Sequence, residues 1–348
     1  MSSRNALLLQ GLTPEDRLIE IGPSFAPVAP KSQGWNTVVV DHASQDELRA
    51  KYTQDPTVHT DRIETVDKIW NGPSLHDIFP ESDWGNYRAV IASHAIEHFP
   101  NPVAFLQSAS RLTHAESGMV SLAVPDKRFC FDVFKPLTTT GDWLDALRHQ
   151  HARHTGVTVF NHIAYHTTNG GHSTWTRQAP VDLALAHDVH YARDLFLAYD
   201  PQQANYVDAH AWIFTPASFE LILFELYVLG LIDWRIARLE ASSASEFIVT
   251  LSKTQPCYLS AADINARRLN LLRRTHAEIL DQTHWMLDGA LPPASPGALP
   301  SLHRDVLEIK QALKAMETTQ GDLQRLLNLL RRLWSKLGPL RRLVRKPQ

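Results

Sequence analysis

The chain has 348 residues, of which 44% are hydrophobic and 20% are charged. This is the composition of a globular protein with a sizeable core, and it excludes a disordered chain. Its two cysteines are too few for a disulfide framework, and no apolar run approaches the length of a membrane span. The apolar run Ala6–Leu9 is too short for a signal peptide, so we expect a cytoplasmic protein.

The net charge of −3 hides an asymmetry between the body of the chain and its C-terminus. Residues 323–348 contain eight Lys or Arg and no acid, which leaves a net charge of −11 for residues 1–322. A nucleic-acid substrate needs a basic groove, and the acidic body therefore argues against nucleic acid as a partner.

The first half of the chain alternates strand-like and helix-like patterns. Short apolar runs rich in β-branched residues predict strands at 17–21, 37–40, 89–92 and 119–124, with a weaker candidate at 66–70. Strands and helices that alternate at this spacing predict a Rossmann-like, doubly wound α/β sheet.

Regular patterns return after residue 208. Thr215–Gly230 begins with Thr-Pro and ends in glycine, which predicts a helix. A closing strand pair is expected at 231–239 and 246–251, followed by a helix at 261–287.

The predicted organisation has five parts. They are a main domain at 1–255 with an insertion at about 130–208, a helical extension at 256–289, a proline-rich linker at 290–301, a coiled coil at 302–338 and a basic tail at 339–348. The insertion is rich in His, Thr and Asn, and we expect it to lie over the carboxyl edge of the sheet as the acceptor side of the site.

The first predicted strand is followed by a loop with a single early glycine. A dinucleotide-binding loop offers several glycines and free backbone amides, whereas this loop has Gly22 and then prolines at 23, 27 and 30. Proline has no amide donor, so the loop suits a ligand without a diphosphate. Glu20, just before Gly22, is expected to pair with a ligand ammonium through a water.

The second predicted strand ends in Asp41, 19 residues beyond Gly22. A carboxylate at this place can accept hydrogen bonds from both hydroxyls of a ribose. The alternative is that Asp41 only caps the next helix.

With these residues in place, the stretches IEIGPS, VVVDH, VIASHAIEHFPNP and LAVPDKRFCFD resemble the type-11 branch of class I S-adenosylmethionine (SAM) dependent methyltransferases. More narrowly, the chain is similar to methyltransferase domains found among bacterial surface-polysaccharide enzymes. The likeness covers residues 15–130 and 207–253, and omits the insertion and the C-terminal third.

The resemblance implies a cofactor site for SAM. Its residues would be Glu20 and Gly22 at the methionine part, Asp41 at the ribose, Asn71 to Leu75 along the adenine, and Ser93 and His94 beside the methionine and sulfonium. Pro23 is also expected to bind the cofactor.

An oxygen acceptor also needs a base that removes its proton. Candidates at the ends of strands are His94 and Asp126, with His210 from the later segment. His98 and Arg128 are expected to bind substrate, although His98 can instead pack beneath the cofactor loop. No metal site is predicted, because the histidines of the insertion have no Cys or acidic cluster at a recognisable ligand spacing.

The function implied is O-methylation of a sugar or glycan-like acceptor in surface polysaccharide biosynthesis. Two alternatives remain open. One is a catalytically silent scaffold whose coiled coil recruits partner enzymes, and the other is an NAD-dependent oxidoreductase, which the proline-rich loop disfavours.

The coiled coil is predicted from periodicity alone. Apolar residues from Leu302 to Leu337 recur at alternating steps of four and three, with one polar break at Gln320. We therefore expect a homo-oligomer. The basic end LRRLVRK suits an anionic membrane surface or an enzyme that makes the acceptor.

Overall fold

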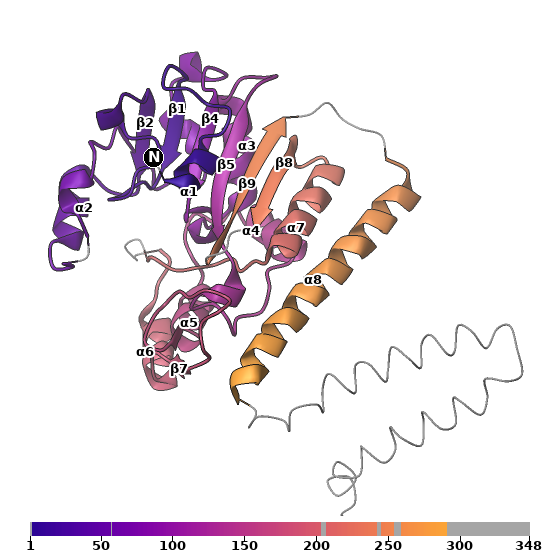
Figure 1. The fold of residues 1–348 in the computed structure, drawn as a ribbon. Helices are drawn as coiled ribbons and strands as arrows, with labels where there is room; N and C mark the ends of the chain where they lie inside the picture. The colour runs from indigo at the N-terminus through magenta and orange to yellow at the C-terminus, as the bar shows by residue number, and fades with distance from the viewer. Residues whose placement is uncertain (1, 57, 203–206, 242–244, 254–258, 291–348) are drawn as a thin grey trace, which may run out of the picture. The chain divides into compact units, whose positions relative to one another are not determined.

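The computed structural model describes residues 2–56, 58–202, 207–241, 245–253 and 259–290 (Figure 1). The chain divides into a compact unit of residues 1–286 and a second unit of residues 287–348. The predicted coiled coil at 302–338 and basic tail at 339–348 lie outside the described residues. Within the described ranges, no helix is long and apolar enough to cross a membrane.

Seven strands of the first unit form one sheet. They are β1 (Leu18–Ile21), β2 (Thr37–Asp41), β3 (Lys68–Ile69), β4 (Ala89–Ser93), β5 (Met119–Pro125), β8 (Trp234–Ala241) and β9 (Glu246–Lys253). Their order is β3-β2-β1-β4-β5-β9-β8, with β9 antiparallel to both of its neighbours and the other pairs parallel. The predicted Rossmann-like, doubly wound α/β sheet is confirmed.

The two faces of the sheet are both buried, as expected for parallel strands covered on each side. In β4, Val90 and Ala92 belong to one apolar cluster, whereas Ala89 and Ile91 belong to the other. This alternation follows from the two-residue period of a strand.

Helices from later in the chain cover one face of the sheet. α3 (Pro102–Leu112), α4 (Thr140–Arg148) and α7 (Pro216–Val228) supply side chains to the larger cluster. α1 (Ser3–Leu8) packs near β5 and β9 and supplies Leu8 to the smaller cluster on the opposite face. α3 and α7 both carry proline at a first-turn position, the start that the Thr-Pro signal predicted for α7.

The connection from β1 to β2 contains no α-helix. It has only the 3₁₀ turn η1 (Lys31–Gln33), because three prolines interrupt the segment that a crossover helix would occupy. The next crossover contains α2 (Gln45–Tyr52), which Ser44 and Glu47 begin with a reciprocal capping box. The other 3₁₀ turns are η2 (Thr60–Arg62), η3 (Leu75–Ile78), η4 (Glu81–Asp83), η5 (Ile96–His98) and η6 (Lys127–Phe129).

The predicted insertion has structure of its own. After α4 come α5 (Gly156–Ala164), β6 (Thr167–Asn169), β7 (Leu183–Leu185) and α6 (Val189–Ala198). α5 packs against α6, and β6 pairs with β7 as an antiparallel ladder. α4 belongs to the body instead, because Trp143 is fully buried in the main core.

The long helix α8 (Ala261–Ala290) packs on the body through its residues up to Met286. Arg274 pairs with Glu220 and Arg268 with Glu225, both on α7. Trp285 stacks on Trp175 of the insertion at 5.9 Å between ring centroids. Residues 259–286 of the predicted helical extension therefore belong to the same compact unit as the sheet.

Candidate functional site

A cavity of about 630 Å³ opens at the carboxyl ends of β1, β2 and β4. The chain reverses its winding between β1 and β4, the place where doubly wound sheets bind ligands. Among the lining residues are Gly22, Asp41 and His94, which directly follow or end these three strands.

The loop after β1 is held open by Glu20. Its carboxylate is 1% exposed and accepts hydrogen bonds from the amides of Val28 at 2.6 Å and Ala29 at 3.0 Å. Gly22 follows with φ +62°, a left-handed conformation that favours glycine. Burial raises the pKa of Glu20 to about 7, although the two amide donors act in the opposite direction.

Most backbone donors of this loop are already used. The amide of Gly22 donates to Val40, that of Ala26 to Pro23, and those of Val28 and Ala29 to Glu20. Prolines at 23, 27 and 30 have no amide hydrogen. Between residues 22 and 30, all of them described, only Ser24 and Phe25 keep amides without such a bond, which is too few to surround a diphosphate.

Asp41 presents one satisfied and one unsatisfied oxygen. Oδ1 accepts from the backbone amide of His42 at 2.7 Å, whereas the buried Oδ2 has no hydrogen-bond partner among the described residues. A buried carboxylate oxygen without a donor costs free energy, so this position calls for a ligand donor such as a hydroxyl group.

A network of charged groups lies at the end of β4. Glu246 Oε2 is 2.6 Å from His94 Nε2, and Arg4 binds both oxygens of Glu246 at 2.6 and 2.9 Å. Arg4 also donates to Ser93 Oγ at 2.5 Å. Burial raises the pKa of Glu246, but the hydrogen bonds from His94 and Arg4 outweigh it and lower the pKa to about 2. Glu246 is therefore ionised at neutral pH, and His94 Nε2 donates to it.

His94 itself has φ +50°, which is uncommon for a residue with a side chain. Its imidazole is 42% exposed and lines the cavity. A non-glycine residue in this conformation at the end of a strand is typical of functional sites, where the surrounding contacts hold it in place.

The insertion forms the opposite wall of the cavity. Arg153, His154, Tyr199 and Asp208 contribute to the lining. Arg153 Nη1 donates to the carbonyl of Asn71 at 2.6 Å and so joins this wall to the loop after β3. Burial lowers the pKa of His154 to about 4, so its imidazole is neutral near pH 7.

Most of the predicted cofactor residues lie around this one cavity. They are Gly22, Pro23, Asp41, Asn71, Ser93 and His94, and the predicted substrate residue His98 joins them. The assignment of the insertion to the same site agrees with its lining residues.

Two predicted cofactor residues do not line the cavity. Glu20 was expected to pair with a ligand ammonium, but both of its oxygens bind the loop behind Gly22. Leu75 was expected along the adenine, but it is fully buried in the main core. Trp70 does line the cavity and lies beside Phe99, with 5.2 Å between ring centroids.

The other corrections concern the predicted base and substrate residues. Arg128 clamps Asp126 with hydrogen bonds of 2.9 and 2.6 Å, and neither residue lines the cavity. His210 lies behind His98, with 4.6 Å between ring centroids, and its Nδ1 is bound to Asp132 at 2.5 Å. Asp126 and His210 are therefore wrong as bases that face this cavity, and Arg128 is wrong as a residue that contacts its ligand.

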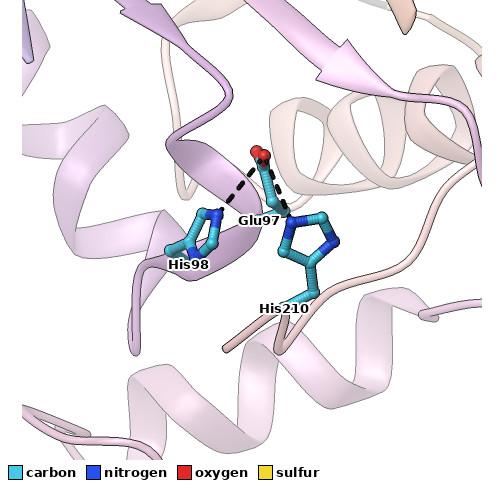
Figure 2. A group of neighbouring side chains, drawn as sticks. All are labelled: Glu97, His98 and His210. Atoms are coloured by element: carbon cyan, nitrogen blue, oxygen red, sulfur yellow. Dashed lines mark ion pairs between the residues drawn. The ribbon is translucent and has the colours of Figure 1, made fainter. Parts of the chain in front are cut away.

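Sequence reasoning missed Arg4, Glu246 and the wall residues of the insertion. Arg4 and Glu246 are 242 positions apart, and neither belongs to a recognisable motif. Glu97 was also missed, although an acidic residue in the apolar stretch VIASHAIEHF is a signal that could have found it. In the folded protein, the Glu97 side chain lies close to those of His98 and His210 (Figure 2).

No known protein family and no curated protein matches the chain. Among solved structures, one described as a putative Zn-dependent alcohol dehydrogenase from Rhodobacter sphaeroides is 14% identical, with a TM-score of 0.40, over 73% of this chain and 91% of that one. The CcbJ methyltransferase from Streptomyces caelestis is 14% identical, with a TM-score of 0.37, over 72% and 94%.

A third structure, described as a putative S-adenosylmethionine dependent methyltransferase from Listeria monocytogenes, is 10% identical. Its TM-score is 0.37 over 73% of this chain and 100% of that one. All three TM-scores lie below 0.5, and these likenesses therefore carry no weight for function.

Proposed function

We propose that this protein is a SAM-dependent methyltransferase that methylates a hydroxyl group of a sugar or glycan-like acceptor in surface polysaccharide biosynthesis. The observation that carries the cofactor assignment is the cavity at the β1–β4 switch point, where Asp41 Oδ2 is buried without a donor. A ribose hydroxyl group would satisfy this oxygen.

The loop after β1 discriminates between cofactors. NAD carries a diphosphate that needs several backbone amide donors. In this loop the prolines have no amide hydrogen, and the amides of Val28 and Ala29 already donate to Glu20. SAM has a ribose and an adenine but no phosphate, so it fits the same cavity without that requirement. This supports a methyltransferase over an oxidoreductase.

The residues around the cavity fit the parts of SAM. Asp41 would accept from the ribose, and the loop at Gly22 lets the backbone approach the ligand. Trp70 and Phe99 offer aromatic surface for the adenine. When bound, SAM would supply a methyl group on its positively charged sulfur.

The acceptor side is assigned to the insertion, whose Arg153, Tyr199 and Asp208 offer polar and aromatic contacts to a hydroxylated ring. Of the three predicted bases, His94 is the one that lines the cavity. Glu246 holds its Nε2, which leaves Nδ1 to take the proton of the acceptor hydroxyl group. The acceptor oxygen then bonds to the methyl carbon, and the carbon–sulfur electron pair returns to sulfur.

Calorimetry on the full-length protein tests the cofactor assignment. Titration with SAM and with S-adenosylhomocysteine should give binding heat, and titration with NAD should give none. Binding of NAD alone would indicate an oxidoreductase. Binding of none of the three would favour a catalytically silent scaffold, and either result would overturn the proposal.

A transfer assay tests the acceptor class. Radiolabelled SAM and a mixture of nucleotide sugars and oligosaccharides should give a labelled product with wild-type protein. His94→Gln should lower the rate by roughly 10²–10⁴-fold while SAM affinity is kept. A variant that turns over at the wild-type rate would exclude His94 as the base.

A further inference from the structure

Glu97 carries a buried carboxylate that no donor satisfies. Its side chain is fully buried, and neither of its oxygens has a hydrogen-bond partner among the described residues. The position is fixed by the backbone, because the Glu97 carbonyl accepts from the amides of Ala211 at 2.8 Å and Trp212 at 3.2 Å. In its ionised form, a carboxylate in such surroundings requires a cation.

Figure 2 shows two imidazoles that turn a nitrogen toward this carboxylate, and His94 Nδ1 lies 3.8 Å from Glu97 Oε1 as well. His98 Nε2 is 3.7 Å and His210 Nε2 is 3.8 Å from Glu97 Oε1. The three ligand atoms all lie within 4.8 Å of one another. The backbone hydrogen bonds of Glu97 bring His210 to this place from more than 100 residues away in the chain.

The distances do not describe hydrogen bonds. An imidazole that donates to a carboxylate lies about 2.7–3.2 Å away, shorter than the separations seen here. Two ligands of an ion with bonds of about 2.1 Å are roughly 3.4 Å apart in a tetrahedral site. A shift of a few tenths of an ångström would therefore bring the His98 and His210 nitrogens to ligand spacing from the Glu97 oxygen.

Each imidazole also has a second carboxylate near its other nitrogen. His98 Nδ1 is 3.1 Å from Asp208, and His210 Nδ1 is 2.5 Å from Asp132. Asp132 is in turn 2.7 Å from the ammonium group of Lys135, and both side chains are 2% exposed. A carboxylate on the far nitrogen of a histidine is characteristic of metal ligands, because it fixes the tautomer and the direction of the ring.

We propose that Glu97, His98 and His210 bind a divalent first-row transition metal ion. Two imidazoles and one carboxylate suit Zn²⁺, Mn²⁺ or Fe²⁺, whereas Mg²⁺ and Ca²⁺ prefer a shell of oxygens. Three protein ligands leave a coordination position open. His98 also lines the cavity, so the ion lies at its wall.

The role of the ion rests on the proposed function. An acceptor hydroxyl group bound at the open position would lose its proton more easily, because a divalent cation lowers the pKa of a bound oxygen. The bond changes are those already given for methyl transfer, and the ion is neither oxidised nor reduced.

Metal binding is measured without SAM or acceptor. Full-length protein is treated with a chelator, dialysed and titrated with Zn²⁺ by calorimetry and with Co²⁺ by visible absorption. Wild type should bind one ion per chain in this site and show the absorption bands of protein-bound Co²⁺. Glu97→Gln and His210→Ala should each weaken binding at least about tenfold.

Two further variants make the result specific. Asp132→Asn keeps all three ligands and should still weaken binding about tenfold, because it loosens the orientation of His210. His149→Ala is the control, since Asp145, His149 and His151 form the other group with ligand spacing among the described residues, and all three are accessible. Its binding should match wild type.

Three results would overturn the metal site. They are no bound ion in wild type, unchanged affinity in both Glu97→Gln and His210→Ala, and loss of binding in His149→Ala alone. Because these readouts need no cofactor, a protein that binds metal but not SAM would overturn the proposed function and leave the metal site standing.

Discussion

At the end of β2, one oxygen of Asp41 is held by the chain and the other is buried without a partner. If the second oxygen receives ribose hydroxyl groups, Asp41→Ala leaves those hydroxyls without an acceptor. The variant should weaken SAM binding by about 2 kcal/mol, roughly 30-fold in affinity. Isothermal calorimetry with SAM and S-adenosylhomocysteine measures the change.

The matched control is Asp77→Ala, which removes a carboxylate that is 65% exposed and outside the cavity. Its affinity should remain that of wild type. Unchanged affinity in Asp41→Ala would remove this residue from the cofactor site.

Glu20 makes stability depend on pH in an unusual direction for an acid. Burial raises its pKa to about 7 in the folded protein, against 4.5 without burial. Between these values the folded state keeps a proton that the unfolded state has lost. The free energy of unfolding therefore falls as pH rises from about 4.5 to 8, by roughly 3 kcal/mol from this group.

Glu20→Gln removes this titration. The glutamine side chain has one oxygen that accepts a hydrogen bond, whereas both carboxylate oxygens of Glu20 accept, from the amides of Val28 and Ala29. Urea unfolding of both proteins at several pH values isolates the effect, because other titrating groups cancel in the difference. The free energy of unfolding of the wild type minus that of the variant should decrease between pH 5 and 8. A constant difference would contradict the raised pKa.

The predicted residues that line the cavity are those beside strand ends. Gly22, Asp41 and His94 were found because a parallel strand predicts where its carboxyl end meets a ligand. Glu246 was not predicted, because its partners Arg4 and His94 lie far away from it in the chain. Asp126 also follows a strand, but whether Arg128 would occupy its oxygens depends on folded geometry.

At the scale of elements, the strands were predictable because a buried strand is a short apolar run. β2 and β4 each extend one residue beyond the predicted run. The docking of α8 was not predictable, because an amphipathic pattern says that a face is buried but not against which partner. The fold places α8 against α7 through ion pairs and against the insertion through Trp285.

Trp285 is the clearest test of this docking. Its ring stacks on Trp175, and its Nε1 donates to the carbonyl of Ala179 at 3.1 Å. Trp285→Ala should lower the free energy of unfolding by about 2–3 kcal/mol, less than a fully buried tryptophan because the ring is partly exposed. Urea unfolding followed by circular dichroism gives the value.

His284→Ala, at the neighbouring exposed position of α8, should change the free energy of unfolding by less than about 0.5 kcal/mol. Equal losses in the two variants would mean that α8 contributes through its helix alone and not through the tryptophan contact.

At the scale of the whole molecule, self-association is still a prediction from the repeat at 302–338. Deletion of residues 300–348 should convert an oligomer into a monomer that still binds SAM, because the sheet, the cavity and α8 all lie before residue 291. Light scattering combined with size-exclusion chromatography measures the mass of both proteins.

Point variants separate the repeat from the rest of the C-terminus. Leu313→Asp places a charge in the predicted apolar seam and should dissociate the oligomer, whereas Gln311→Asp lies outside the seam and should not. A full-length protein that is monomeric at micromolar concentration would exclude the coiled coil as an oligomerisation element.

The hydrogen bond from Arg153 to the Asn71 carbonyl affects how long a ligand stays bound, and not its affinity. It is already made without a ligand, so it contributes equally to the free and bound forms and cancels from the dissociation constant. A ligand that passes between the insertion and the loop after β3 must wait for this bond to break. At about 1 kcal/mol, the contact lengthens the residence time of such a ligand roughly fivefold.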